Sequence, residues 1–309
     1  MPYPSNGTRS PRHRPHLTCV ELCAGAGGQA LGLERAGYEH LLLVDNDPDC
    51  CATLRYNRPK WKVWNADVRA LPPDLQLSGP LDLLAGGLPC PPFSIAGKKL
   101  GEADERNLFP TALDIVERVQ PRAVMFENVK GLMGPSFAEY RKRIEERFGG
   151  LGYHTDWRIL NASDFGVAQL RPRLVLIALI ENYWKNFTWP IPSLTLPPTV
   201  GEVLADLMAE HGWEGADAWA NKASSIAPTI VGGSKKHGGP DLGPTRAKQA
   251  WRKLGVNAHT VAEAPPPKGF VGDPALSVAM VAQLQGFPRD WVFTGRKTSS
   301  YRQVGNAFP

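Results

Sequence analysis

The stretch LTCVELCAGAGGQALG, residues 17–32, decides the fold expected for this chain. Its first six residues form a short apolar, β-rich run, which is typical of a buried strand. Three glycines come next, and residues 26–36 have helical character. A strand that passes through a glycine-rich turn into a helix is a typical opening of a parallel α/β sheet. Taken alone, the turn is equally consistent with a tight connection that binds nothing.

The alternation of strands and helices continues to about residue 182. It predicts an α/β fold with a mostly parallel, doubly wound sheet that carries helices on both faces. We expect strands at 17–22, 40–45, 62–64, 81–86, 121–128, 154–160 and 174–180, and helices at 26–36, 48–54, 107–119 and 137–148.

The composition divides the chain into four parts. Residues 1–16 are predicted to be a disordered basic tail, and residues 17–182 to form the main domain. Residues 183–276 are rich in Pro, Gly, Ala and Trp, with few long periodic segments, and are predicted to form a second, smaller, loop-rich domain. Residues 277–288 are helical in pattern again, so residues 277–309 are expected to return to the main domain.

Several classes of protein are disfavoured by the bulk composition. No apolar run reaches the roughly 18 residues of a membrane span, and the N-terminus has no secretory pattern. The five cysteines are an odd number without a framework spacing, which indicates reduced thiols in a cytosol. No CxxC or paired histidine spacing predicts a metal site. The net charge of +5 favours a nucleic-acid partner only slightly.

Two aspartates point to a nucleotide-like cofactor. Asp45 ends the second predicted strand about 20 residues after the glycines, where a carboxylate can bind ribose hydroxyls. Asp67 follows the third strand, in reach of an adenine amino group. Each aspartate alone is equally a helix cap or a surface residue. The GxGG pattern lacks the third glycine of a dinucleotide site, which weakens a dehydrogenase interpretation and leaves room for S-adenosylmethionine.

A thiol, a carboxyl group and two arginines are predicted at the same edge of the sheet. Cys90 lies in GGLPCPPFSIAGKK, residues 86–99, where prolines hold a rigid turn just past a strand. Glu127 ends the next strand, and QLRPR, residues 169–173, precedes the last one. Burial can raise the pKa of such a glutamate enough for it to donate a proton. Taken separately, these groups are better explained as an idle thiol, a cap and a salt-bridged turn, and only their shared position at strand ends favours a functional site.

The ordered motifs CAGAGG, LPCPPFS, ENV, QLRPR, LQGFP and YRQVGNAFP resemble those of DNA (cytosine-5) methyltransferases. The resemblance covers residues 17–182 and about 277–309. It implies that the target cytosine leaves the duplex, because its reactive atoms are out of reach inside the stack. The implied chemistry is attack of the Cys90 thiolate on carbon 6, assistance by Glu127 at nitrogen 3, and methylation of carbon 5 by S-adenosylmethionine, which leaves S-adenosylhomocysteine.

The resemblance also implies roles for individual residues. Arg171 and Arg173 would join Cys90 and Glu127 as catalytic residues that steady the base and Glu127. Cys23 stands where the family often has phenylalanine, which puts a ring contact to the cofactor in doubt. The implied cofactor-binding residues are Cys23, Gly25, Gly27, Gly28, Asp45, Asn46, Asp67, Val68, Leu108 and Asn306. The implied DNA-binding residues are Ser94, Lys98, Lys99, Gln169, Thr229, Lys235, Lys236 and His237.

The implied setting is a bacterial, cytoplasmic, nucleoid-associated enzyme. It would act on double-stranded DNA as a monomer, within a system that also has a cognate restriction endonuclease. Residues 183–276 would be the target-recognition domain. The chain stops at NAFP, where the family continues into a helix, so the expectation is truncation or completion by another polypeptide. Three alternatives stay open: a tRNA cytosine-5 methyltransferase, a DNA-binding protein without catalysis and, more distantly, a nicotinamide-dependent oxidoreductase.

Overall fold

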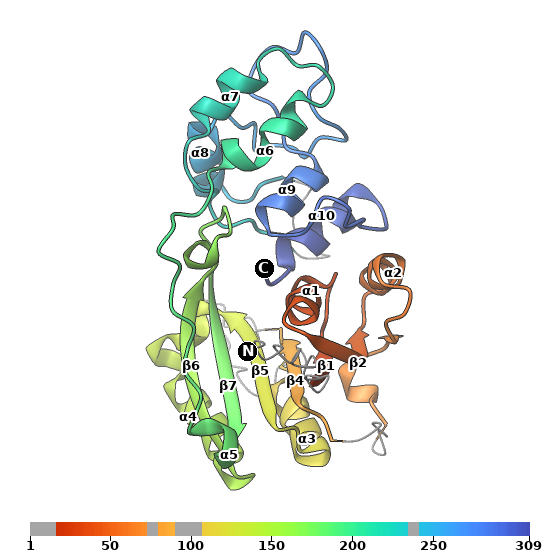
Figure 1. Cartoon of the computed structure of the whole chain (residues 1–309), viewed down its shortest axis with the longest axis vertical. Helices are drawn as coiled ribbons and strands as arrows, with labels where there is room; N and C mark the ends of the chain where they lie inside the picture. The colour runs from red at the N-terminus through yellow and green to blue at the C-terminus, as the bar shows by residue number, and fades with distance from the viewer. Residues whose placement is uncertain (1–16, 73–79, 90–106, 234–240) are drawn as a thin grey trace, which may run out of the picture.

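The computed structural model describes residues 17–72, 80–89, 107–233 and 241–309. A seven-stranded sheet forms the lower part of the molecule (Figure 1). Its strands are β1 (Leu17–Leu22), β2 (Tyr38–Asp45), β3 (Val63–Asn65), β4 (Leu83–Gly87), β5 (Ala123–Val129), β6 (Tyr153–Asn161) and β7 (Pro172–Ile180). The α-helices are α1 (Gly28–Arg35), α2 (Pro48–Asn57), α3 (Phe109–Val119), α4 (Ala138–Gly150), α5 (Glu181–Trp184), α6 (Val200–Ala209), α7 (Ala216–Lys222), α8 (Thr245–Lys253), α9 (Val278–Leu284) and α10 (Lys297–Asn306). Short 3₁₀ turns are η1 (Val68–Ala70), η2 (Lys130–Met133), η3 (Pro135–Phe137) and η4 (Ala162–Phe165).

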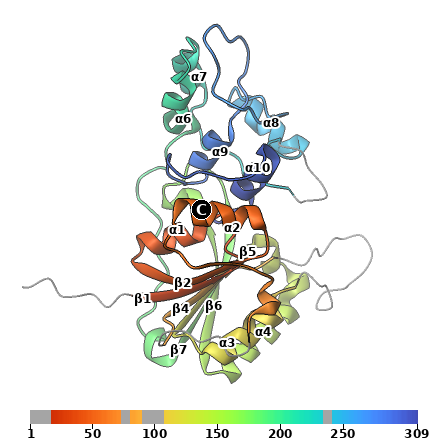
Figure 2. The same ribbon diagram turned by 90° about the vertical axis from the view of Figure 1, so that its right-hand side faces the viewer.

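The predicted mostly parallel sheet is confirmed. The strand order is β3-β2-β1-β4-β5-β7-β6, and only β7 runs antiparallel to its neighbours. Alternate residues of β1 explain the two helical layers (Figure 2). Cys19 packs with Leu33 of α1, whereas Val20 belongs to the cluster that includes α3 and α4. The sheet is therefore buried on both faces, as a doubly wound fold requires.

The chain reverses its direction of travel across the sheet between β1 and β4. From β1 it proceeds outward to β2 and β3, and from β4 it proceeds the other way to β5. In open α/β sheets, ligands bind in the crevice outside the carboxyl ends of strands at such a switch point. The turns after β1 and β4 begin at Cys23 and Leu88, so this place in the fold is where a site is expected.

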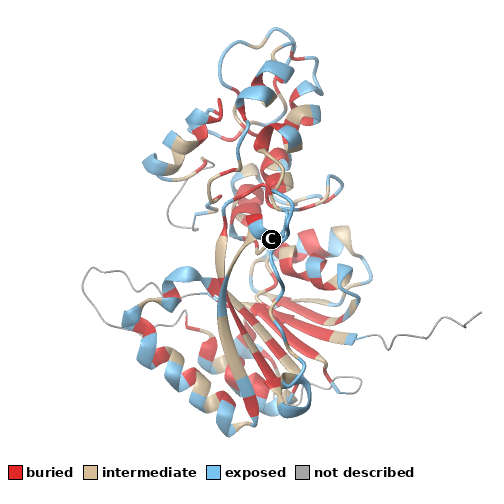
Figure 3. Ribbon diagram, turned by 60° about the vertical axis from the view of Figure 1, so that its left-hand side comes forward, coloured by how far each residue is buried: buried red, intermediate tan, exposed pale blue. Residues whose placement is uncertain are grey.

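The upper part of the molecule contains α6 to α10 (Figure 1). A single buried cluster joins residues of 200–261 with residues of 276–307, including Trp219, Trp251 and Tyr301. Figure 3 shows buried residues concentrated on the strands and between these upper helices. The described residues of 183–276 form three helices of seven or more residues, α6, α7 and α8, where the composition predicted mostly loops. We call this α6–α10 body the upper lobe.

Helix α10 was not predicted, and it is one of the elements that connect the upper lobe to the sheet domain. Gln303 accepts a hydrogen bond from the Thr53 hydroxyl of α2 at 2.6 Å, and Ser299 donates to Asp49 at 2.5 Å. Arg302 pairs with Asp47, which caps the start of α2, at 3.3 Å.

Among the described residues, no helix has the length and apolar character needed to cross a bilayer.

Candidate active site

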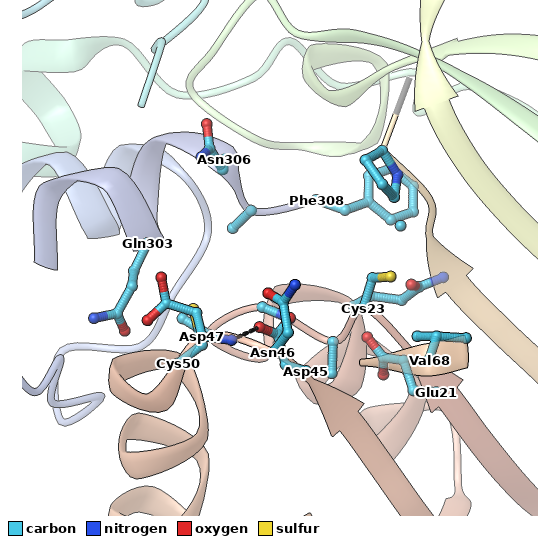
Figure 4. Close-up of a pocket in the computed structure, with 18 of the residues that line it drawn as sticks. Glu21, Cys23, Asp45, Asn46, Asp47, Cys50, Val68, Gln303, Asn306 and Phe308 are labelled. Carbon is cyan, nitrogen blue, oxygen red and sulfur yellow. Dashed lines mark hydrogen bonds between the residues drawn. The ribbon is translucent and has the colours of Figure 1, made fainter. Parts of the chain in front are cut away.

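A cavity of about 530 Å³ lies outside the carboxyl ends of the central strands (Figure 4). We call it the sheet-end cavity. Most residues of its floor lie within 21–29, 45–50 and 66–69, at the ends of β1, β2 and β3 and in the turns that follow them. Its roof is formed by Arg302, Gln303, Asn306, Ala307 and Phe308. Gly87, Pro89, Leu108, Glu127 and Gly233 complete the lining among the described residues.

The glycine turn forms one end of the floor. Gly25 has φ 55°, a backbone angle that glycine adopts without strain, and its N–H donates to the Asp45 carboxylate at 2.8 Å. A Cβ on Gly28 would lie 2.2 Å from the carbonyl oxygen of Phe308, so the floor and roof backbones touch at this glycine. Gly27, predicted to bind the cofactor, is instead packed against Leu54 and Trp291 and does not line the cavity.

All of the other predicted cofactor residues line it: Cys23, Gly25, Gly28, Asp45, Asn46, Asp67, Val68, Leu108 and Asn306. Asp45 accepts N–H bonds from Gly25 and Asp47, each at 2.8 Å, and thereby joins two strand-end turns. Asp67 caps η1 and pairs with Arg69 at 2.6 Å, which lowers the pKa of Asp67. Both carboxylates are thus ordered at the cavity before any ligand binds.

Two thiols of the lining are kept protonated. Cys23 has φ 53°, unusual for a residue with a side chain, so the turn holds it in a strained conformation. Burial, followed by the charges of Asp45, Asp67 and Glu21, raises the pKa of Cys23. Burial likewise raises the pKa of Cys50, and Asp45 adds to the effect. Because the thiolate is the nucleophilic form, neither group is suited to react with an electrophile in the cavity.

Glu127 and Arg173 meet because β7 is antiparallel. Val129 pairs with Arg173 and Glu127 pairs with Val175, so Glu127 and Arg173 lie on the same face of adjacent strands. Arg173 Nε lies 2.8 Å from Glu127 Oε1. Burial raises the pKa of Glu127, while the charges of Arg173 and Arg171 oppose that rise. The arrangement keeps the carboxyl group in a fixed orientation and makes it easier to protonate than a glutamate in solvent.

Arg171 is placed differently from its prediction. Its side chain is buried and donates to three backbone carbonyls: Ile230 at 2.6 Å, Gly305 at 2.8 Å and Ala307 at 2.8 Å. Only Arg173 forms an ion pair with Glu127 in the described structure. Arg171 therefore attaches the roof to the start of β7, while its charge also acts on Glu127.

Gln169 also differs from its prediction. It has no exposed surface, so its side chain is not available to DNA in this structure. Its amide group bonds to the side chain of Gln285, while its oxygen accepts from the N–H of Ile230 at 2.9 Å. Gln285 in turn donates to the carbonyls of Val304 and Ala307, at 3.0 and 2.9 Å. The two glutamines thus contribute to the contact between the sheet domain and the upper lobe.

Thr229 is partly buried, and its hydroxyl donates to the Leu170 carbonyl at 2.6 Å. This bond also joins the upper lobe to the sheet domain. The remaining predicted residues lie outside the described part of the chain. They are Cys90, Ser94, Lys98, Lys99, Lys235, Lys236 and His237.

The residues next to these two undescribed stretches lie at the cavity. Pro89, which precedes Cys90, and Gly233, which precedes residues 234–240, both line it. Asn128 donates from its amide to the Leu88 carbonyl at 2.9 Å, so the end of β5 fixes the backbone that leads into Pro89. Glu127 and Asn128, which fixes the backbone before Pro89, are thus consecutive residues of β5.

Sequence reasoning missed several lining residues. Glu21 is buried and lies 3.7 Å from His40, and burial raises the pKa of Glu21. Its position directly before the glycine turn was a usable signal. Asp47 offered a weaker signal, because an aspartate before a helix is usually a cap. The roof side chains also offered weaker signals, because the part of the chain that contains them was not predicted to be helical. The missed residues include Glu21, Asp47, Cys50, Arg69, Arg302, Gln303 and Phe308.

The charges of the cavity indicate what it accepts. Its described lining contains five carboxyl groups (Glu21, Asp45, Asp47, Asp67 and Glu127) and two arginines, Arg69 and Arg302. Both arginines are paired with lining carboxylates. Such a lining suits a cationic ligand with hydroxyl groups and disfavours the pyrophosphate of a dinucleotide. Within the described residues, no group of three or more His, Cys, Asp or Glu side chains is arranged to hold a metal ion.

Comparison with known proteins assigns the family. Residues 17–309 match the family model described as C-5 cytosine-specific DNA methylase. The Type II methyltransferase M.NaeI of Lentzea aerocolonigenes is 56% identical over 301 residues, which span 95% of this chain and 72% of that protein. The Type II methyltransferase M.NgoMIV of Neisseria gonorrhoeae is 48% identical over 302 residues, which span 95% of this chain and 93% of that protein.

Solved structures agree on the fold. A prophage-encoded protein from Escherichia coli, described as a DNA modification methyltransferase, superposes with a TM-score of 0.65 at 21% identity, with 94% of each chain covered. DNMT2 of Spodoptera frugiperda superposes with a TM-score of 0.64 at 18% identity, with 94% of this chain and 95% of that chain covered. The family match, the two relatives and the sheet-end cavity lead to one conclusion: this chain belongs to the C-5 cytosine-specific DNA methylase family.

Proposed function

We propose that this protein transfers a methyl group from S-adenosylmethionine to carbon 5 of a flipped-out cytosine in a specific duplex DNA sequence, through a covalent Cys90 adduct. The single observation that carries the proposal is the composition of the sheet-end cavity. The glycine turn, Glu127 and Pro89, the residue before Cys90, all open onto it. A donor on the floor and a base beside Glu127 would therefore share one cavity.

The chain's own residues suit S-adenosylmethionine. Asp45 lies where ribose hydroxyls would be bound, Val68 and Leu108 offer apolar surface to an adenine, and the surplus of carboxyl groups favours a cationic sulfonium compound. When bound, S-adenosylmethionine supplies an electrophilic methyl group. Cys23 and Cys50 remain thiols and so do not compete for it.

The proposed reaction uses three side chains. The thiolate of Cys90 forms a bond to carbon 6 of the cytosine, and Glu127 donates a proton to nitrogen 3, where the displaced electron pair would otherwise accumulate. Arg173 keeps Glu127 oriented. Carbon 5 thereby becomes nucleophilic enough to accept the methyl group. Loss of the carbon-5 proton to solvent then expels the Cys90 thiolate, and the proton on nitrogen 3 returns to Glu127.

The proposed setting is a bacterial, cytoplasmic restriction-modification system, in which the enzyme acts as a monomer and protects DNA from a cognate endonuclease. Its support is the Type II methyltransferase designation of the two relatives. Residues 183–276 are proposed as the target-recognition domain, with Ser94, Lys98, Lys99, Thr229, Lys235, Lys236 and His237 as DNA contacts. The support for Thr229 is its hydrogen bond to Leu170, which belongs to the same QLRPR segment as Arg173.

The direct test is methyl transfer from labelled S-adenosylmethionine. Purified protein is incubated with unmethylated duplex DNA of mixed sequence, with tRNA, or with neither. We expect label in duplex DNA only, and none with Cys90→Ala. Cys19→Ala is the matched control, because Cys19 is buried in the core beneath α1 and should leave transfer intact. Label in tRNA, or unchanged transfer by Cys90→Ala, would refute the proposal.

A trapping experiment tests the adduct separately. Duplex DNA with 5-fluorocytosine at a methylated position cannot lose a proton from carbon 5, so the Cys90 bond should persist and give a denaturation-resistant complex. We expect that complex with wild-type protein and much less of it with Glu127→Gln, because the ring is then not protonated. Absence of a complex on a confirmed substrate site would exclude the covalent route.

A further inference from the structure

Trp291 belongs to the short segment between α9 and α10, and Figure 2 shows these helices above α1 and α2. Its side chain is buried but does not line the sheet-end cavity. The indole N–H donates to the carbonyl of Ala26 at 3.2 Å, across 265 residues of sequence. Ala26 is part of the glycine turn and does line the cavity. A residue of the upper lobe therefore holds the backbone of the floor.

The same indole ring fills the space beside Gly27. A Cβ at Gly27 would lie 3.0 Å from Trp291 Cζ2 and 2.7 Å from Leu54 Cδ2, so a side chain here would displace these groups. Gly27 also has φ 91°, an angle that L side chains rarely adopt. Trp291 thus contacts two consecutive residues of the turn, through a hydrogen bond at Ala26 and through packing at Gly27.

The indole ring is itself held by the ends of α1 and α2. The Arg58 guanidinium lies 5.1 Å from the centroid of the Trp291 ring and pairs with Glu34 of α1 at 2.8 Å. The next residue, Val292, exchanges two hydrogen bonds between its backbone and the Asn57 side chain, at 2.7 and 2.9 Å. These contacts fix the position of the ring, and through it the position of the turn, before any ligand binds.

The attachment continues along α2. The Thr294 N–H donates to the Thr53 hydroxyl at 2.9 Å, and the Thr294 hydroxyl donates to the Asp49 carbonyl at 3.0 Å. Asp49, Thr53 and Asn57 are spaced by four residues, so they lie on one face of the helix. The segment that begins at Trp291 therefore follows this face of α2, which places the indole ring at the glycine turn.

We propose that Trp291 is a positioning residue for methyl transfer, which sets the glycine turn in the conformation that binds S-adenosylmethionine. This inference rests on the proposed function. A protein that adopts its binding-competent conformation only part of the time binds its ligand more weakly by that fraction. Loss of the Trp291 hydrogen bond frees the turn, and should therefore weaken cofactor binding without removing any contact to the cofactor.

Trp291→Phe tests the hydrogen bond, because phenylalanine keeps an aromatic ring but has no N–H. Calorimetry gives the dissociation constant of S-adenosylmethionine without DNA, and we expect binding to weaken about fivefold, the size of one net hydrogen bond. Trp219→Phe is the matched control. Trp219 is also buried, and its indole N–H donates to the Gly255 carbonyl at 2.9 Å, within the upper lobe. This control should lose stability but keep the wild-type dissociation constant.

Hydrogen exchange separates positioning from a general loss of stability. Without ligand, peptides that cover residues 24–28 should exchange faster in Trp291→Phe than in wild type, and saturating S-adenosylmethionine should restore their protection. Trp219→Phe should show no such local change. A wild-type dissociation constant in Trp291→Phe, or an equal loss of affinity in Trp219→Phe, would overturn the proposal.

Arg58→Met provides the test if Trp291→Phe does not fold. It removes the cation that lies over the Trp291 ring, so it should weaken S-adenosylmethionine binding in the same direction, by about twofold. An unchanged dissociation constant in folded Arg58→Met would then overturn the proposal. Failure of the wild-type protein to bind S-adenosylmethionine would instead contradict the proposed function.

Discussion

The floor and the roof of the sheet-end cavity are built in opposite ways. The floor comes from strand-end turns whose residues are close in sequence, and its ties are short: Asp45 reaches Gly25 and Asp47, 20 and 2 residues away. The roof comes from the end of α10, and Arg171 holds it from 134 and 136 residues away. The roof is thus attached by a few buried long-range hydrogen bonds, whereas the sheet itself holds the floor.

This difference separates two kinds of functional residue. Floor residues determine what the cavity accepts, because their carboxylates and small side chains face the ligand. Residues such as Arg171, Gln169 and Gln285 determine whether the cavity has a roof at all. Loss of a floor carboxylate should therefore act on affinity, and loss of a roof tie should act on stability and affinity together.

The largest effect is expected where floor and roof touch. Gly28→Ala places a Cβ 2.2 Å from the Phe308 carbonyl oxygen, a backbone atom that cannot turn aside. We expect a loss of about 3 kcal/mol in the free energy of unfolding and no measurable cofactor binding. Chemical denaturation of the variant and of Gly32→Ala checks this, since Gly32, also in α1, has nothing within 4 Å of its Cβ position. Gly32→Ala should be neutral or stabilising by up to about 1 kcal/mol, and equal losses in the two variants would refute the close contact.

The next effect comes from the roof tie. Arg171→Met removes the donor of the Ile230 and Gly305 carbonyls and leaves the Ala307 carbonyl with its bond from Gln285 alone. The expected cost is about 2 kcal/mol, with weaker S-adenosylmethionine binding. Arg173→Met is the comparison, because Arg173 forms its ion pair with Glu127 rather than with the roof. We expect it to reduce methyl transfer far more than cofactor affinity. If Arg171→Met behaved like Arg173→Met, with intact binding and lost transfer, Arg171 would belong to the catalytic group after all.

Glu127 sharpens the comparison through pH. Burial raises its pKa in the folded state, so the folded protein binds this proton more tightly than the unfolded chain does. The protonated Glu127 carboxyl stabilises the folded state fully below the pKa of the unfolded chain, about 4.3. This stabilisation is lost as the pH rises through the pKa of Glu127 in the folded protein. Urea denaturation from pH 5 to 8.5 should show Glu127→Gln gaining stability relative to wild type as the pH increases, by about 1.4 kcal/mol per unit of pKa shift. A pH-independent difference would mean that the carboxyl group is ionised throughout.

The smallest effect is expected on the exposed side of the floor. Asp67 pairs with Arg69 near the surface, where such pairs contribute little, so Asp67→Asn should change the free energy of unfolding by less than about 0.5 kcal/mol. Because Arg69 lowers the pKa of Asp67, the contribution is present at neutral pH and is lost as the pH falls through the folded pKa. Acid titration of both proteins checks the sign. A large loss at neutral pH would assign Asp67 a structural role that its exposure argues against.

Much of the sheet domain was predictable because its signals are local. Apolar runs ended by glycine or aspartate placed the strands to within a few residues, and strand ends brought Asp45, Asp67 and Glu127 to one edge. The buried partners of Gln169 and Arg171 were not predictable from sequence, because both side chains bond to residues of the upper lobe that are far away in the chain. Helix α10 was missed, and with it the roof position of Phe308.

The sequence by itself determined the parallel sheet, the glycine turn and the presence of Glu127 and Arg173 at strand ends, since periodicity and turn chemistry are written in neighbouring residues. Only the tertiary structure decided that Arg171 holds the roof, that Gly27 packs in the core and that Phe308 faces Cys23. The physical reason lies in the partners. Arg171 and Gln285 donate mainly to backbone carbonyl groups of residues far away in the chain. Because every residue has the same carbonyl group, no sequence pattern identifies these partners.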